Sequence, residues 1–332
     1  MKFTLIICTY HRAKPLLKLL NSVEEQTLFP DQILIIDGSR DEETWKMLEG
    51  SSFSNLEYFK IPEENRGLTK QRNFGIRKVA KSSEIVCFLD DDIVLTPPYF
   101  ENLINTYTEF PDALGVGGYI IEEVKWERTE NNELEFDEFQ FSGWKRKLGS
   151  RNVLRKKLNL LSNEPPGYMP KAGNGFSTGF LPPSGKIYPV EFFMGGVASY
   201  KKKLFKLVKF SEYFEGYGLY EDMDLCLRAS QVGQLYVNTD AQLYHNHEEG
   251  GRPNKFKYGK MVVRNGWYVW RVKFQNPPLK AKFKWHATAC LLTLIRIGNV
   301  LTTSEKKSAF TESMGRIWGW WSLLWDKPKV QL

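Results

Sequence analysis

Residues 84–93 read EIVCFLDDDI, and this stretch decides the fold. Its apolar half predicts a buried β-strand, which ends on three consecutive carboxylates, Asp90, Asp91 and Asp92. Adjacent like charges repel one another at a strand end unless a divalent cation or a basic ligand neutralises them. Mg²⁺ and Mn²⁺ prefer such oxygen ligands and keep free positions for phosphate oxygens. The stretch therefore predicts a metal site for a phosphorylated ligand, with a solvated acidic turn as the alternative.

The segments around this strand alternate between short apolar runs and helical patterns. Apolar runs lie at 3–8, 32–36 and 56–60, and helices are predicted across 15–26 and 69–80. Such alternation is typical of an α/β protein with a doubly wound, mostly parallel sheet. In that sheet the strand ends that carry Thr9, Asp37 and the three aspartates meet at one edge, where open α/β sheets bind their ligands.

Length and cysteine content place few limits on the fold. A chain of 332 residues is long enough for one large α/β domain with additions or for two average domains. The four cysteines lie far apart and form no CxxC pair, which favours reduced thiols in a cytosolic protein. The first apolar run follows a single lysine, too early for the apolar core of a signal peptide, so we expect no export signal.

The charge is distributed unevenly along the chain. Residues 251–332 hold 16 Lys and Arg against 3 Asp and Glu, a balance of +13, together with seven of the ten tryptophans. The first 250 residues hold 30 against 36, a balance of −6. Basic charge combined with interfacial aromatics is typical of a surface that meets anionic lipid, and no nucleic-acid-binding motif is present. We therefore expect an anionic membrane surface, and no nucleic acid, as a partner of this tail.

An apolar stretch within the tail, residues 287–300, is interrupted by Arg296. A spanning helix needs about 20 apolar residues, so we expect this helix to lie in the membrane interface. The alternatives are a helix packed on the core and a helix that joins the subunits of an oligomer.

Six short motifs follow one another along the first 250 residues. They are ICTYHR at 7–12, IDGS at 36–39, NRG at 65–67 with QRN at 71–73, LDDD at 89–92, GG at 195–196 and YEDMD at 220–224. Their order resembles that of the inverting family 2 glycosyltransferases, which have the Rossmann-like GT-A fold. The resemblance implies that a sugar moves from a nucleotide-diphosphate donor to an acceptor hydroxyl, with Mn²⁺ or Mg²⁺ as cofactor.

The resemblance assigns the metal site. Asp92 is the first choice for direct ligation, and Asp90 or Asp91 then binds the ribose hydroxyls or joins the metal shell. His245, which follows an apolar strand, would complete the shell, with His247 or a structural hydrogen bond as the alternatives.

The resemblance also assigns the nucleotide site. Asp37 would accept a hydrogen bond from the imide N–H of uracil, which favours a UDP-sugar, although thymine offers the same N–H. The alternative role of Asp37 is an ordinary Asx-turn. Thr9 and Tyr10 would line the base. Arg12 and Arg72 would lie near the base or the phosphates, where the guanidinium fork matches phosphate oxygens, with a salt bridge as the alternative.

The acceptor side of the site is implied by the last two motifs. In an inverting transfer a carboxylate must take the proton from the acceptor hydroxyl. By resemblance that base is Asp222, and Glu221 lies beside it to orient the acceptor; the alternative is that both acids favour the positive end of a helix. Gly195 and Gly196 would form an acceptor-side loop, or simply a tight turn.

These observations predict a GT-A domain at residues 1–250, with a nucleotide-binding half at 1–120 and an acceptor half at 121–250 that includes a mobile insertion at 122–185. Residues 251–332 would form a basic, mainly helical, membrane-associating tail. We expect a glycan or lipid-linked acceptor of cell-envelope polysaccharide synthesis, and a peripheral location on the cytoplasmic, inner face of the membrane. The rival functions are a non-catalytic GT-A protein that binds glycan or membrane, and a sugar nucleotidyltransferase.

Overall fold

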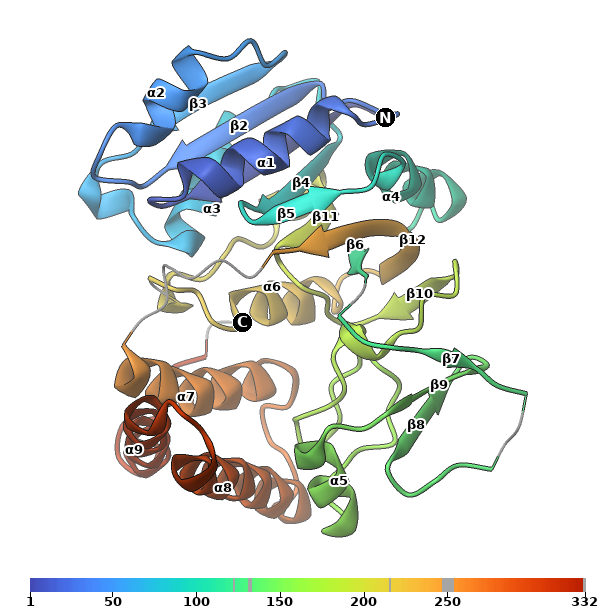
Figure 1. Ribbon diagram of the computed structural model, residues 1–332, viewed down its shortest axis with the longest axis vertical. Coiled ribbons are helices and arrows are strands. Elements are labelled where there is room, and N and C mark those ends of the chain that lie inside the picture. Colours follow the sequence, from blue (N-terminus) through green and yellow to red (C-terminus); the bar gives the residue numbers. More distant parts are fainter. Residues whose placement is uncertain (122, 131–132, 215, 247–253, 331–332) are drawn as a thin grey trace. The chain divides into compact units, whose positions relative to one another are not determined.

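The computed structural model describes residues 1–121, 123–130, 133–214, 216–246 and 254–330. The chain divides into two compact units. The first unit comprises residues 1–124 and 183–251, and the second unit comprises residues 125–182 and 252–332. The chain therefore leaves the first unit and returns to it before the C-terminal helices begin (Figure 1).

The first unit is built on a nine-stranded mixed sheet with the order β10-β12-β6-β11-β4-β1-β2-β3, in which β5 pairs with β12. Its parallel part consists of β1 (Phe3–Thr9), β2 (Gln32–Asp37), β3 (Leu56–Lys60) and β4 (Ile85–Asp90). The remaining strands are β5 (Ile93–Leu95), β6 (Gly115–Ile120), β10 (Ile187–Val190), β11 (Val197–Lys201) and β12 (Leu235–His245). Strand β11 is antiparallel to both of its neighbours, β4 and β6.

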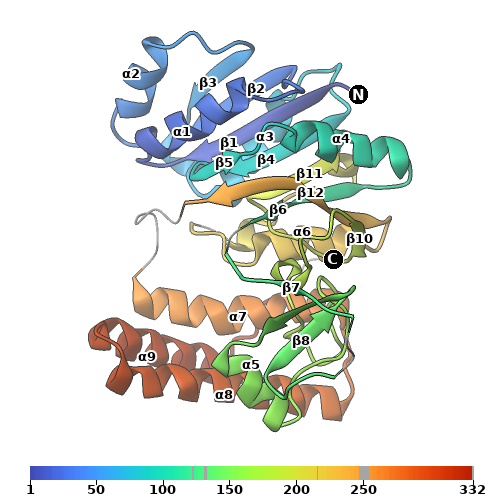
Figure 2. The same ribbon diagram turned by 45° about the vertical axis from the view of Figure 1, so that its right-hand side comes forward.

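Five α-helices belong to the described part of this unit: α1 (Ala13–Glu24), α2 (Glu43–Glu49), α3 (Leu68–Lys78), α4 (Tyr99–Glu109) and α6 (Glu221–Ala229). Helices α1 and α3 cover opposite faces of the parallel strands (Figures 1 and 2). Leu5 of β1 is buried in the same cluster as Leu16 of α1. Ile6 points the other way, and a Cβ on Gly75 of α3 would lie 2.8 Å from Ile6 Cγ2. Strands buried on both faces read as continuous apolar runs, which is why the sequence located them.

In its described residues, the second unit combines a small sheet with four α-helices. The antiparallel sheet has the order β7-β9-β8, made of β7 (Glu127–Arg128), β8 (Glu138–Phe141) and β9 (Trp144–Lys147). The helices are α5 (Ser150–Lys157), α7 (Lys255–Lys273), α8 (Leu279–Thr302) and α9 (Lys306–Ser322). Figures 1 and 2 both show α7, α8 and α9 side by side.

Glycines bring α7 and α9 into direct backbone contact. A Cβ on Gly259 of α7 would lie 2.1 Å from Glu312 O, and a Cβ on Gly315 of α9 would lie 2.0 Å from Phe256 O. Neither position therefore accepts a side chain unless the helices separate. Among the described residues, no helix combines the length and the apolar character needed to cross a bilayer.

The strands and helices predicted for residues 1–90 are confirmed to within about two residues at each end. The prediction of a mostly parallel sheet holds from β4 to β3, but the antiparallel β11 makes the sheet as a whole mixed. The segment predicted as a mobile insertion at 122–185 contains β7, β8, β9 and α5. The structure groups residues 125–182 with the C-terminal helices, whereas the predicted division placed them in the GT-A domain.

Candidate active site

The carboxyl ends of the parallel strands bring the predicted donor-side residues together. In the sheet register Thr9 lies opposite Asp37, and Cys8 lies opposite Asp90. Thr9 Oγ1 donates a hydrogen bond to Asp91 Oδ2 at 2.7 Å, which links the end of β1 to the residue that follows β4. The predicted convergence of strand ends on one edge is therefore present in the first unit.

Asp91 and Asp92 form a cluster with Arg12 and His245. Arg12 Nη1 donates to Asp91 Oδ1 at 3.1 Å and to Asp92 Oδ2 at 3.0 Å. His245, the last residue of β12, places Nε2 3.2 Å from Asp92 Oδ1. Arg12 and His245 thus offset the repulsion between Asp91 and Asp92.

The two carboxylates of this cluster respond differently to their surroundings. Burial raises the pKa of Asp91 to about 6, although the hydrogen bonds from Thr9 and Arg12 lower it. Burial would also raise the pKa of Asp92, but the hydrogen bond and charge of His245 outweigh it and the pKa is lowered. The hydrogen bond to Asp92 in turn raises the pKa of His245. Asp92 therefore keeps its negative charge to a lower pH than Asp91 does.

Asp92 and His245 fit a divalent cation. Two ligand atoms that each lie about 2.1 Å from a metal, at right angles, are about 3.0 Å apart, and the Asp92–His245 separation of 3.2 Å is close to this. Within the described ranges, no group of three or more His, Cys, Asp and Glu side chains forms a cation site. Such cations are commonly held by one or two protein side chains together with substrate phosphates and water. His247, the predicted alternative ligand, lies outside the described residues.

Asp37 is fully buried at the end of β2. Its Oδ1 accepts a hydrogen bond from Ser39 N at 2.7 Å, and its Oδ2 accepts one from Tyr58 OH at 2.7 Å. The first contact is the Asx-turn that the sequence left as the alternative. Both oxygens are therefore engaged within the protein, and contact between Asp37 and a base stays a prediction.

Arg72 lies at the centre of a second cluster. Its side chain is buried between the rings of Phe88 and Phe210, with Cζ 5.6 Å and 5.3 Å from their centroids. Nη1 donates to Glu221 Oε1 at 2.5 Å, and Nη2 lies 3.3 Å from Asp90 Oδ1. Burial lowers the pKa of Arg72, but the charges of Glu221 and Asp90 raise it further than burial lowers it.

Asp222 is held by backbone N–H groups. The residue before the helix, Tyr220, has φ 71°, and this left-handed turn places Glu221 and Asp222 in the first turn of α6. Asp222 Oδ2 accepts from Gly195 N at 3.0 Å, and Oδ1 accepts from Met223 N at 2.7 Å. Burial raises the pKa of Asp222, although these two N–H groups act in the opposite direction.

The two glycines of the predicted acceptor loop are sites of close approach. A Cβ on Gly195 would lie 2.7 Å from Arg72 Nη1 and 2.8 Å from Asp222 Cβ. A Cβ on Gly196 would lie 2.2 Å from Asp90 Oδ2. These positions allow the backbone to lie directly against the side chains of the site. The role of the two glycines in an acceptor-side loop stays a prediction.

Glu221 is 4% exposed and its observed partner is Arg72. Its Oε2 has no hydrogen-bond partner among the described residues, and burial raises its pKa against the charge of Arg72. These contacts assign Glu221 to holding Arg72. A contact with the acceptor, the role expected from the sequence, stays a prediction.

Residues 4–169, half of the chain, match the model of glycosyl transferase family 2. The chain belongs to glycosyl transferase family 2. This confirms the predicted family and, with it, the predicted enzyme class, a glycosyltransferase.

Two curated relatives of this family 2 chain align with part of their length. The Glucosyl-dolichyl phosphate glucuronosyltransferase of Haloferax volcanii is 28% identical over 123 residues, which is 36% of this chain and 39% of the relative. The O-antigen chain rhamnosyltransferase RfbN of Salmonella typhimurium is 27% identical over 109 residues, 33% of this chain and 34% of the relative. The chain thus matches between a third and two fifths of the length of these proteins.

Solved structures share the fold of this family 2 chain. Mannosyltransferase PcManGT from Pyrobaculum calidifontis, in complex with GDP-Man and Mn²⁺, has a TM-score of 0.55 at 16% identity, and the match covers 98% of this chain and 88% of the mannosyltransferase chain. TarS 1–349 of S. aureus, in complex with UDP, has a TM-score of 0.51 at 16% identity, and the match covers 92% of this chain and 77% of the TarS chain. The predicted GT-A fold with a helical C-terminal region is therefore confirmed.

Several residues around this family 2 site were not predicted. Tyr58 binds Asp37 from the edge strand β3, and Glu123 Oε1 lies 3.7 Å from His245 Nδ1. Phe210, which stacks on Arg72, is fixed by Asn73 through hydrogen bonds to its backbone N and O at 3.1 Å and 2.8 Å. Of these, only Asn73 lay in a motif. Tyr10, predicted to line the base, is 41% exposed and packs edge-on against His11.

Proposed function

We propose that this protein transfers a sugar, with inversion, from a nucleotide-diphosphate donor to an acceptor hydroxyl, and that Asp222 is the general base. The observation that carries the proposal is the position of Asp222 at the start of α6, fixed by Gly195 N and Met223 N beside the Arg72 cluster. A base that is oriented by backbone donors keeps a lone pair available for the acceptor proton. Its raised pKa brings it closer to neutral pH, where a base works best.

The donor side of the proposal uses the strand-end cluster. Asp92 and His245 would hold Mn²⁺ or Mg²⁺, which when bound compensates the charge of the departing diphosphate. Arg12, which contacts Asp91 and Asp92, and Arg72, which contacts Asp90, would attract the phosphates. Support comes from two solved relatives whose complexes contain Mn²⁺, one with GDP-Man and one with UDP and GalNAc.

We propose UDP as the nucleotide on the basis of Asp37. For Asp37 to accept the imide hydrogen of uracil, Oδ2 must share or exchange the hydrogen bond that Tyr58 donates. The solved neighbours were obtained with GDP-Man in one case and UDP in another, so the fold accommodates both bases.

The acceptor is proposed to be a glycan or a lipid-linked sugar of the cell envelope. Support comes from the relative from Haloferax volcanii, whose name includes a dolichyl phosphate, and from the relative from Salmonella typhimurium, whose name includes an O-antigen chain.

Asp222→Asn tests the transfer. Because general-base catalysis contributes about 10²–10⁴-fold, we expect turnover to fall by about that factor while calorimetric binding of UDP with Mn²⁺ is unchanged. Glu109→Gln, on the exposed end of α4, is the matched control and should keep full turnover. Retained turnover in Asp222→Asn would exclude Asp222 as the base. If wild type binds no nucleotide, the non-catalytic alternative replaces the proposal.

We further propose that the second unit docks on the cytoplasmic face of an anionic membrane. Helices α8 and α9 each present apolar side chains to solvent at intervals of three, four or seven residues: Leu279, Phe283, Cys290, Leu294, Ile297 and Leu301 on α8, and Phe310, Met314, Trp318 and Trp321 on α9. Arg296, which interrupts the apolar stretch, pairs with Glu312 of α9 at 2.9 Å. Residues 251–332 hold 16 basic against 3 acidic residues, which complements anionic lipid.

Flotation with lipid vesicles tests the docking. We expect Trp318→Ser with Trp321→Ser to reduce partition onto phosphatidylglycerol vesicles by about tenfold or more, since each tryptophan would bury a large apolar area. Trp45→Ser, an exposed tryptophan of the first unit, is the control. A defined oligomer without vesicle binding would instead assign these faces to contacts between subunits.

A further inference from the structure

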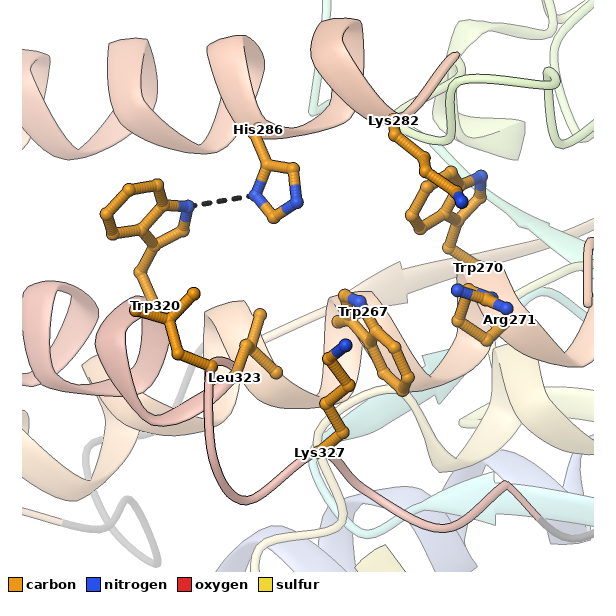
Figure 3. Close-up of a pocket in the computed structure, with 9 residues that line it drawn as sticks. Trp267, Trp270, Arg271, Lys282, His286, Trp320, Leu323 and Lys327 are labelled. Atoms are coloured by element: carbon orange, nitrogen blue, oxygen red, sulfur yellow. Dashed lines mark hydrogen bonds between the residues drawn. The ribbon is translucent and has the colours of Figure 1, made fainter. Parts of the chain in front are cut away.

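A cavity of about 190 Å³ lies within the second unit, between α7, α8 and the end of α9 (Figure 3). Three tryptophans, Trp267, Trp270 and Trp320, line it. Trp270 is firmly fixed, because its ring stacks on Trp285 with the centroids 5.4 Å apart and the planes at 9°, and its Nε1 donates to Lys171 O at 2.9 Å. The cavity therefore has a rigid aromatic wall.

Three cationic side chains line the same cavity and come from three different segments. They are Arg271 of α7, Lys282 of α8 and Lys327 of the segment after α9. No carboxylate lines the cavity, and none of the three forms an ion pair with another residue in the part of the chain that the structure describes. Like charges gathered at one site are stabilised when an anion binds between them.

Arg271 is prepared for an anion by its aromatic neighbours. Its Cζ lies 5.2 Å from the ring centroid of Trp267 and 5.7 Å from that of Trp270. Its Nε has no acceptor among the described residues. A guanidinium that stacks on aromatic rings keeps its planar fork of N–H donors free for the oxygens of a phosphate.

His286 adds a donor to this cavity. Burial, followed by the charge of Lys327, lowers the pKa of His286, so the ring is neutral. Its Nδ1 accepts a hydrogen bond from Trp320 Nε1 at 3.0 Å, and a neutral imidazole that accepts at Nδ1 carries its proton on Nε2. Figure 3 shows this second ring nitrogen on the side away from Trp320. The charged and polar groups facing the cavity are thus all donors.

We propose that this cavity binds the phosphate group of a lipid, with Arg271, Lys282 and Lys327 around the phosphate oxygens. The lipid is favoured over a soluble phosphate because the cavity is also lined by Leu323 and Leu324, and Leu324 is 66% exposed. The adjacent Trp325 is 64% exposed, so apolar chains that leave the cavity meet an apolar surface. The inference deepens the membrane docking proposed above and is independent of the transfer reaction.

Binding of a soluble short-chain phosphatidic acid, kept below its micelle concentration, tests the cavity without a membrane. We expect it to change the tryptophan fluorescence of the full chain. Arg271→Gln with Lys282→Gln should weaken the binding by about tenfold or more, because hydrogen bonds to charged groups are each worth about this much. Lys280→Gln with Lys284→Gln removes the same charge from α8 outside the cavity and should weaken it far less.

Two further arms separate the sources of the phosphate and guard against misfolding. Inorganic phosphate should bind much more weakly than the short-chain lipid, and equal affinity would overturn the lipid assignment. Arg271→Lys keeps the charge but loses the planar fork, so we expect an intermediate loss at an unchanged melting temperature. An equal loss of lipid affinity in the cavity variant, Arg271→Gln with Lys282→Gln, and in the control variant, Lys280→Gln with Lys284→Gln, would show that the cavity is not the binding site.

Vesicles that contain phosphatidic acid separate this inference from membrane docking in general. If the cavity pair and the control pair lose vesicle binding equally, the attraction is diffuse charge, so the cavity proposal is wrong while the docking proposal stands. If the short-chain lipid binds but wild type does not float with vesicles, the docking proposal is wrong and the cavity site stands.

Discussion

Removing Arg72 should destabilise the first unit in a pH-dependent manner. Arg72 is 2% exposed and Glu221 is 4% exposed, and the two side chains are hydrogen-bonded at 2.5 Å. Arg72→Met keeps the packing between Phe88 and Phe210 but leaves Glu221 buried without its cation. Removing one partner of a buried ion pair costs about 3–5 kcal/mol. Asp90 contributes little to this loss, because its side chain is 45% exposed and water can solvate its charge.

The loss should depend on the charge of Glu221. In Arg72→Met, burial raises the pKa of Glu221 without the opposing charge of Arg72, so the folded variant binds a proton more tightly than the unfolded chain does. The variant therefore loses stability as the pH rises from the ordinary value of 4.5 through the raised pKa, by up to about 1.4 kcal/mol per pH unit. In the wild type burial also raises the pKa of Glu221, but the charge of Arg72 keeps it lower than in the variant. The loss relative to the wild type therefore grows with pH and is smallest at acidic pH, where Glu221 is neutral in both proteins.

Hydrogen exchange of peptides from α3 and α6 measures this effect in the first unit alone, since local opening reports on each segment separately. We expect Arg72→Met to lower the opening free energy by about 3–5 kcal/mol at pH 8 and by at least about 1 kcal/mol less at pH 5. Adding Glu221→Met should recover much of the loss, because it removes the unpaired charge. An equal loss at both pH values, or a double variant no more stable than the single one, would refute the reasoning.

Two other predictions concern the metal pair and the helical unit. His245→Ala should weaken Mn²⁺ binding, measured by calorimetry, about tenfold or more. In the wild type the affinity should rise with pH, because Asp92 raises the pKa of His245 above 6.5 and only the neutral imidazole can bind the metal. His245→Ala should abolish this pH dependence. His11→Ala, outside the metal pair, should keep that pH dependence, and a loss in both variants would contradict the assignment. Gly315→Ala should destabilise the second unit by about 1–3 kcal/mol, because its Cβ would meet Phe256 O at 2.0 Å. Gly298→Ala is the control in α8, because a Cβ at this position has no atom within 4 Å among the described residues, and it should raise the stability by about 0.5–1 kcal/mol. Thermal unfolding measures both variants, and equal changes in stability would disprove the close contact of α7 and α9.

The sequence predicted elements whose side-chain pattern is set locally. Strand β1 is buried on both faces and its sequence, FTLIICT, is mainly apolar, so its position followed from the local residue pattern alone. Strand β9 could not be found in this way, because its residues, WKRK, read as a basic surface run. Its lysines are instead neutralised by neighbours, with Lys145 Nζ 3.3 Å from Glu138 Oε1 and Lys147 Nζ 3.1 Å from Asp137 Oδ1. Pairing of this kind depends on the fold of the hairpin and leaves no periodic signal.

The same distinction applies to the site. Strand topology predicted that Thr9, Asp37 and the three aspartates would share one edge, and they do. The partner that each side chain chooses depends on contacts far apart in sequence, such as the pair of Arg72 with Glu221, 149 residues away. A motif gives the residue type at a position, but it does not give the side-chain rotamer that decides which acidic residue an arginine pairs with.

The choice of partners distinguishes the proposed base from the other acids of the site. Arg12 pairs with Asp91 and Asp92, and Arg72 pairs with Asp90 and Glu221. Within the described ranges, Asp222 has no cationic side chain within 4.0 Å, and its oxygens rest on two backbone N–H groups. Burial raises the pKa of both Glu221 and Asp222, so a raised pKa alone does not separate the two acids. Glu221 Oε1 is taken up by the guanidinium of Arg72, whereas Asp222 is held by neutral backbone donors and has no paired cation, in the described part of the chain, that competes with an incoming proton. This arrangement favours Asp222 over Glu221 as the base, even though the two residues are adjacent.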